Sequence, residues 1–196
     1  DPTYVEIEIP DQFPPMSIPS DNPTTEEGIA LGKKLFFEKR LSGDNTQACA
    51  SCHAQSFGFT DNGLQFSEGI DGLVGDRNSM QIINLGWATT LFWDGRSASL
   101  EEQAIEPVLN PIEMHETWSN AMIKIMQDEA YQDMFFYAFG VSNPDSTHAA
   151  KAIAQFERTM ISANSRFDKY LRNEIMLNPS ELNGRALFNR DRVAIE

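Results

Sequence analysis

Apolar residues recur at helical spacing through most of the second half of the chain. The clearest amphipathic stretch is PDSTHAAKAIAQFERTMISA, whose apolar residues fall near one side of a helix. TWSNAMIKIMQ and DEAYQDMFFYAFG predict two more helices, the second ending at Gly140. SLEEQAIEPV predicts a helix with Ser99 and Glu102 at capping-box spacing, and PSELNGRALF predicts a last helix capped by Ser180.

The first half has fewer periodic segments. The proline-rich residues 1–23 predict an extended arm with one short strand, at Tyr4 to Ile9. TTEEGIALGKKLFFEKR predicts a helix with a capping box formed by Thr24 and Glu27, and Ser79 to Leu85 a short one. Between them, residues 42–77 are rich in Gly, Asp, Asn and Ser, with only a helical turn at the cysteines. So long a loop is unusual unless it wraps something, so the class predicted is all-α with long loops around a cofactor.

Composition narrows the choice of partners. The chain has 196 residues, a formal net charge of −14 and 41% hydrophobic residues, enough for a real core. No segment has the apolar length of a membrane span. The excess of acidic residues argues against nucleic acid or an anionic membrane as partner. It would attract a basic protein, although acidity as often serves only solubility.

Both cysteines lie in one motif, Cys49-Ala50-Ser51-Cys52-His53. A disulfide or redox dithiol of this spacing is typical of βαβ proteins, and no such alternation occurs here. Structural zinc needs about four N or S ligands, and the other two histidines, His115 and His148, are far along the sequence. C-x-x-C-H is the attachment signature of c-type haem, with His53 next to the two thiols as the iron ligand. Thioether attachment also indicates assembly outside the reducing cytosol.

The sixth iron position separates an electron carrier from an enzyme. An electron-transfer cytochrome would use Met or His there, and the chain has eight Met, most of which we expect to be core filler.

Three stretches read together resemble the bacterial dihaem cytochrome c peroxidase family: LGKKLFFEKRLSGDNTQACASCHAQSFGFTDN, GDRNSMQIINLGW and LFWDGRSASLEEQAIEPVLNPIEM. The resemblance runs from about Glu27 to Glu196, and F-W-D-G-R is its most distinctive element. It implies a class I cytochrome c-like haem domain.

The resemblance also implies roles for single residues. His53 would be the proximal ligand of the peroxidatic haem. Glu113 matches the distal carboxylate that moves protons, and Gln103 the amide that orients peroxide or water. Trp93 matches an indole between two haems, and Asn78 a ligand of an interdomain calcium. Taken alone, Glu113 would be a surface acid, Trp93 a core residue, Gln103 an ordinary helix residue and Asn78 a helix cap.

Two departures from the family pattern matter. Many members place a distal histidine where this chain has Ile70, so we predict an iron without histidine on its distal side. A second C-x-x-C-H is missing, so we read the chain as the peroxidatic half of a longer protein, with a native one-haem protein as the alternative. The expected domains are an arm at residues 1–17 that packs on the missing half, the haem domain at 18–165, and the start of the second haem domain at 166–196.

The expected function is reduction of hydrogen peroxide to water, with electrons from a small cytochrome or blue-copper protein through a second haem c. The rivals are a dihaem oxidase of tryptophans in a partner protein and a plain monohaem electron-transfer cytochrome. The resemblance further implies a periplasmic protein, exported after loss of a signal peptide, and in many relatives a homodimer.

Overall fold

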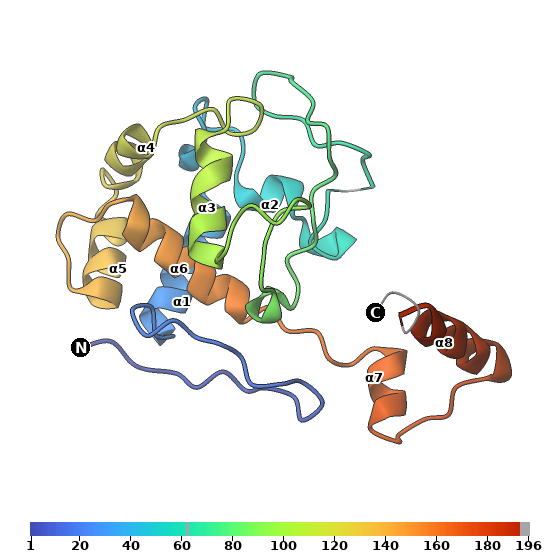
Figure 1. Cartoon of the computed structure of the whole chain (residues 1–196). Helices are drawn as coiled ribbons and strands as arrows, with labels where there is room; N and C mark the ends of the chain where they lie inside the picture. The colour runs from blue at the N-terminus through green and yellow to red at the C-terminus, as the bar shows by residue number, and fades with distance from the viewer. Residues whose placement is uncertain (62, 193–196) are drawn as a thin grey trace. The chain divides into compact units, whose positions relative to one another are not determined.

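The computed structural model describes residues 1–61 and 63–192, which form helices joined by long loops (Figure 1). Within these ranges no strand occurs, and only isolated β-bridges join neighbouring loops. The predicted all-α class is confirmed. The predicted strand at Tyr4 to Ile9 is wrong, because Tyr4 forms one bridge with Thr25 and pairing does not continue.

The chain divides into two compact units, Asp1–Glu8 with Met16–Ile161, and Ile9–Pro15 with Ser162–Glu196. Residues 1–8 belong to the first unit because Val5 N donates to Thr24 O at 3.0 Å and Thr3 bonds the Glu27 carboxylate. Only residues 9–15 of the expected arm therefore group with the C-terminal segment. That residues 166–196 begin a second haem domain stays a prediction.

Two helices cross at the centre of the first unit, α1 (Glu26–Phe36) and α6 (Ser146–Arg158) (Figure 1). They approach closely because α1 has glycine at the crossing: a Cβ at Gly32 would collide with the carbonyl of Ala152. At the N-terminal end of α1, the buried Gln155 accepts from Thr25 N at 2.9 Å through Oε1. Thr25, not Thr24, caps α1, since its hydroxyl accepts from Gly28 N.

Three further helices complete this unit: α3 (Leu100–Leu109), α4 (Trp118–Ile125) and α5 (Glu129–Phe139). Ser99 caps α3 as predicted, and Gly140 ends α5 with the left-handed backbone that glycine adopts without strain. Their apolar faces meet those of α1 and α6 in one core, which includes Leu31, Leu35, Val108, Trp118, Ile125, Tyr131, Phe135 and Ile153.

A long loop between α1 and α3 carries only short helical turns: η1 (Lys39–Leu41), α2 (Cys49–Cys52), η2 (Gln55–Phe57) and η3 (Leu85–Trp87). The helix predicted at Ser79 to Leu85 is wrong. The Ser79 hydroxyl pairs with that of Ser67 at 2.6 Å, and Asn84 is left-handed, with its N–H donated to Met160 O. These contacts hold the segment extended, and it forms part of the wall of the cavity described below.

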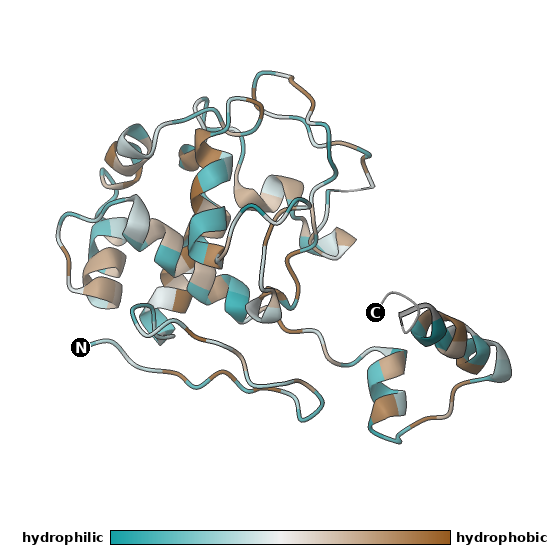
Figure 2. Ribbon diagram, viewed as in Figure 1, coloured by the Kyte–Doolittle hydropathy of each residue, from teal (hydrophilic) through white to brown (hydrophobic). Residues whose placement is uncertain are grey.

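The second unit contains α7 (Arg166–Leu171), which periodicity did not reveal, and α8 (Pro179–Arg192). Asn178, not Ser180, caps α8: Glu181 N donates to Asn178 Oδ1, and Asn178 N to the Glu181 carboxylate. Most residues of α8 are hydrophilic, with a few apolar residues among them (Figure 2). Among the described helices, none combines the length and apolar character needed to cross a bilayer.

Candidate functional site

A cavity of about 580 Å³ lies in the first unit, within the size range of cofactor sites. Its walls come from α2, α3, α6 and the loops at 67–80, 92–96 and 110–114. All the residues that the sequence singled out line it: Cys49, Cys52, His53, Asn78, Trp93, Gln103 and Glu113. Folding therefore joins segments up to 64 positions apart in one place.

The two cysteines project into the cavity from α2. Three residues apart on a single helical turn, both thiols lie on one face, and neither forms a disulfide. Burial raises the pKa of Cys49 to about 12 and that of Cys52 to about 11. A redox dithiol requires a lowered thiol pKa, so these values argue against that alternative.

His53 follows α2 directly and is held by the next turn of chain. Ala54 pairs with Thr60, and Phe59, with its left-handed backbone, brings its carbonyl to 3.3 Å from His53 Nδ1. When Nδ1 donates this bond, the other ring nitrogen, Nε2, keeps a free lone pair, as a metal ligand must. Burial lowers the pKa of the imidazole, and hydrogen bonds with backbone groups of Phe59 and Met80 partly oppose this effect. The ring is therefore in its neutral, ligating form.

Glu113 stands on the loop after α3, which the end of that helix fixes in place. The last carbonyls of α3 accept from loop N–H groups, Pro107 O from Met114 and Val108 O from Glu116. Asn110 Nδ2 donates to Glu113 Oε1 at 2.7 Å. Burial raises the pKa of Glu113, although the Asn110 bond opposes this. The carboxyl is thus poised nearer to working pH than an exposed glutamate.

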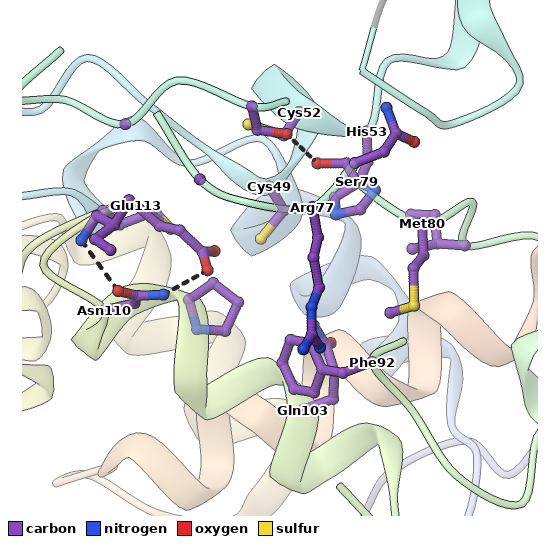
Figure 3. A pocket seen from close by; sticks show the side chains of 18 of the residues that line it. Cys49, Cys52, His53, Arg77, Ser79, Met80, Phe92, Gln103, Asn110 and Glu113 are labelled. Carbon is purple, nitrogen blue, oxygen red and sulfur yellow. Dashed lines mark hydrogen bonds between the residues drawn. The ribbon is translucent and has the colours of Figure 1, made fainter. Parts of the chain in front are cut away.

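Figure 3 places Glu113 and Asn110 on one side of the cavity and Cys52, His53 and Ser79 on the other. Gln103 enters from the second turn of α3, on the same face as Ala104 and Pro107, which also line the cavity. Apolar side chains complete the walls, among them Ala48, Ile82, Phe92, Met114 and Ile153. A cavity of this size whose exposed surface is mainly apolar suits a porphyrin.

Trp93 lies at the rim with 65% of its surface exposed, so the expectation that it would be a core residue is wrong. Its Nε1 donates to Asn78 O at 2.7 Å, which joins the D-R-N and F-W-D-G-R motifs. A second link is Asp94, which binds Arg77 Nη1 at 2.7 Å and Arg96 Nη1 at 3.1 Å. The two arginines lower the pKa of Asp94 to about 2.

The Asn78 side chain donates from Nδ2 to Leu64 O at 2.6 Å. It caps no helix, because the segment after it is extended. In the described part of the chain, no cluster of three or more Asp, Glu, His or Cys side chains could hold a metal ion. Calcium at Asn78 would depend on amide and backbone oxygens, and it stays a prediction.

The other two histidines lie outside the cavity wall. His115 Nδ1 pairs with Asp71 at 2.5 Å on the surface, and His148 bonds Asp145 at the start of α6. Ile70 is also absent from the lining, since its N–H bonds Glu113 O and its side chain points to Gly43. Among the residues described as lining the cavity, His53 is therefore the one histidine.

Known proteins resemble this chain over most of its length. The family model described as "Di-haem cytochrome c peroxidase" matches residues 26–175. The chain belongs to this family. It is 39% identical to "Cytochrome-c peroxidase IdrP1" of Pseudomonas sp. (strain SCT) over 180 residues, covering 90% of this chain and 47% of that protein. It is 37% identical to "Methylamine utilization protein MauG" of Methylorubrum extorquens over 172 residues, 87% of this chain and 48% of that one.

Among solved dihaem-family structures, a "MauG-like protein associated with microbial copper homeostasis" superposes with a TM-score of 0.86. It is 36% identical, and the match covers 94% of this chain and 55% of that one. The likeness confirms the cytochrome c-like fold. The chain thus spans about half the length of the dihaem relatives it matches.

The residues present fit a covalently attached haem. Two free thiols on one helical turn, a partly buried neutral imidazole with an oriented ring and mainly apolar walls meet at one cavity. Three lining residues were not found from the sequence: Asn110, the partner of Glu113, and Arg77 and Arg96 at the rim. The N-P-x-E pattern after α3 could have indicated Asn110, because Asn often bonds the backbone two residues on, as its Oδ1 does to Ile112 N.

Proposed function

We propose that this chain forms the peroxide-reacting half of a dihaem cytochrome c peroxidase. The proposal is carried by one observation: the haem-attachment motif and the partly buried carboxyl of Glu113 line the same cavity. Haem c bound there would supply the iron at which peroxide binds and accepts electrons. Cys49 and Cys52 would hold it by thioether bonds, and His53 would ligate the iron from the proximal side.

Glu113 would act as the proton carrier. Its ionised carboxylate would take a proton from one peroxide oxygen and return it to the other, so that the O–O bond breaks with water as leaving group. In total, one peroxide, two electrons and two protons give two waters. The raised pKa makes both steps feasible near neutral pH, since a carboxyl far more acidic would not return the proton. Gln103 would orient the peroxide with its amide.

Electrons would reach this half through Trp93 from a second haem c held elsewhere in the protein. The exposed indole at the cavity rim is placed for such a relay. The donor would be a small cytochrome or blue-copper protein in the periplasm, with a basic face that complements the acidic surface. Calcium at Asn78 and a homodimer complete the proposal.

Oxidation of tryptophans in a partner protein is the second candidate. It is favoured by the absence of a cavity-lining histidine other than His53 in the described residues, and by the 37% identity to MauG. A plain electron-transfer cytochrome would need a sixth ligand, and Met80 and Met114 line the cavity. That reading leaves the partly buried Glu113 without a role.

The deciding experiment mixes the haem-loaded ferric protein with stoichiometric hydrogen peroxide and follows the haem absorption. We expect a high-spin ferric spectrum and a rapid reaction, slowed about 10²–10⁴-fold in Glu113→Gln. Glu129→Gln, on the surface of α5, controls for the lost charge. A low-spin protein inert to peroxide would instead support the electron carrier. Oxidation of a partner protein's tryptophans, rather than of a cytochrome donor, would select the second candidate.

A further inference from the structure

One carboxyl at the cavity wall, that of Glu157, is almost fully buried. Glu157 lies in the last turn of α6 with 4% of its surface exposed, and it lines the cavity. Its Oε2 is buried without a hydrogen-bond partner. A buried polar oxygen left unpaired costs free energy, and a buried ionised carboxylate costs far more. The proposed peroxide reaction does not use this residue.

The neighbouring charges do not neutralise Glu157. Arg158, the next residue along α6, turns to α3, where its Nη2 binds Glu101 Oε1 at 2.7 Å. Asn22 Nδ2 also donates to Glu101 Oε1, at 2.6 Å. Burial raises the pKa of Glu157 to about 8, with Arg158 opposing and Glu101 adding to the rise. On α2, the thiol of Cys49 is the further titratable group that feels this charge.

Among the helices packed against α6, α1 makes the most extensive contact, and it turns glycine and apolar side chains inward. Glu157 is itself shielded from water, and haem c bound in this cavity would change its charge by one unit on reduction of the iron. Charges interact strongly in such surroundings, because little water screens them. Coupling between two sites is reciprocal: if reduction of the iron favours protonation of Glu157, that protonation must favour reduction by the same free energy.

We propose that Glu157 couples proton uptake to reduction of the haem attached at Cys49 and Cys52. Its carboxylate takes up one proton as the iron accepts one electron, Fe³⁺ becoming Fe²⁺ and Glu-COO⁻ becoming Glu-COOH. It releases this proton when the iron is oxidised. The electron comes from the donor protein, or from a chemical mediator in the experiment. Glu157 thus acts on the iron through its charge and does not touch the reacting atoms. The inference rests on the haem site of the proposed function but not on peroxide turnover.

The test is a redox titration of the haem-loaded protein at pH values from 6 to 10, following the absorbance of this haem. For one proton per electron, the potential falls by about 59 mV per pH unit within the titration window of Glu157. We expect Glu157→Gln to remove this slope in the window. Glu129→Gln serves as the surface control and keeps the slope. Glu157→Asp, which retains a titratable group, should keep a slope in a shifted window if the Gln variant does not fold.

Infrared difference spectra between the oxidised and reduced wild-type protein supply a second readout. We expect a C=O band of a protonated carboxylic acid that appears on reduction, shifts with carbon-13 labelling of glutamate and is lost in Glu157→Gln. A flat potential in the wild type overturns the inference, as does a slope that Glu113→Gln removes and Glu157→Gln retains. Both results leave the peroxidase proposal intact. A protein without haem at Cys49 and Cys52 would overturn both.

Discussion

The side-chain amide of Asn110 donates from Nδ2 to Oε1 of Glu113 over 2.7 Å, on the wall of the cavity. The same amide accepts from Ile112 N through Oδ1, and Asn110 itself ends α3. The helix end, the turn and the carboxyl are therefore fixed together before any substrate binds. The bond also stabilises the ionised form of Glu113 against the burial that raises its pKa.

Replacing Asn110 by Ala should raise the pKa of Glu113 further, because the ionised carboxylate loses a donor while remaining buried. If Glu113 must be ionised in the free enzyme, the acid limb of the pH profile of kcat/KM moves to higher pH, by up to about 1 unit. Asn120→Ala is the matched control: Asn120, in the first turn of α4, donates from Nδ2 to Glu116 Oε2 at 2.8 Å, and neither residue is among those described as lining the cavity. An acid limb that stays in place or moves to lower pH would contradict this role.

Glycine at the crossing of α1 and α6 should be irreplaceable. In Gly32→Ala the new methyl group meets the backbone carbonyl of Ala152, so the helices must separate. We expect the free energy of unfolding to fall by about 1–3 kcal/mol or more, measured by guanidinium denaturation of the haem-loaded protein. Gly184→Ala in α8 is the control: a Cβ there meets nothing within 4 Å, and the variant should gain about 0.5–1 kcal/mol of helix stability. Equal effects of the two changes would argue against the tight crossing.

The sequence predicted the chemistry of the site better than its geometry. C-x-x-C-H is a local pattern whose residue types indicate haem directly, and F-W-D-G-R carries the resemblance to the family. Cys49, His53 and Glu113 line one cavity. Helices with a strong apolar period, such as α6, were also predicted correctly. Each of these depends on neighbours within a turn or two of the chain.

What the sequence did not reveal depends on contacts between distant segments. Asp94 binds Arg77, 17 residues earlier, and Glu157 reaches the cavity only because α6 crosses beneath it. The segment after Asn78 has helix-compatible residues, but the Ser67–Ser79 bond and the bond from Asn84 N to Met160 O hold it extended. No periodicity encodes such tertiary contacts.

Donor turnover should fall as salt rises. The chain carries a net charge of −14, which attracts a basic redox protein over a distance that salt shortens from about 10 Å at 0.1 M to about 3 Å at 1 M. We expect kcat/KM for a basic cytochrome to decrease steadily between these concentrations. The direct reaction with peroxide, a neutral molecule, should stay constant and serves as the internal control. A donor rate that is flat or rises with salt would show that the acidic surface does not steer the donor.

Trp93→Phe should separate the peroxide reaction from electron delivery. The change keeps an aromatic ring at the cavity rim but removes the Nε1 bond to Asn78 O and the readily oxidised indole. We expect the stoichiometric reaction with peroxide to keep its rate, while steady-state turnover with the donor protein falls at least about tenfold, an increase of 1.36 kcal/mol in the activation free energy. Trp118→Phe is the matched control, because the Trp118 indole also donates to a backbone carbonyl, that of Ile105, but is buried in the core away from the cavity. That variant should lower stability and leave both rates per folded haem unchanged. Turnover that survives in Trp93→Phe, with donor and peroxide both saturating, would exclude the indole as an obligatory relay.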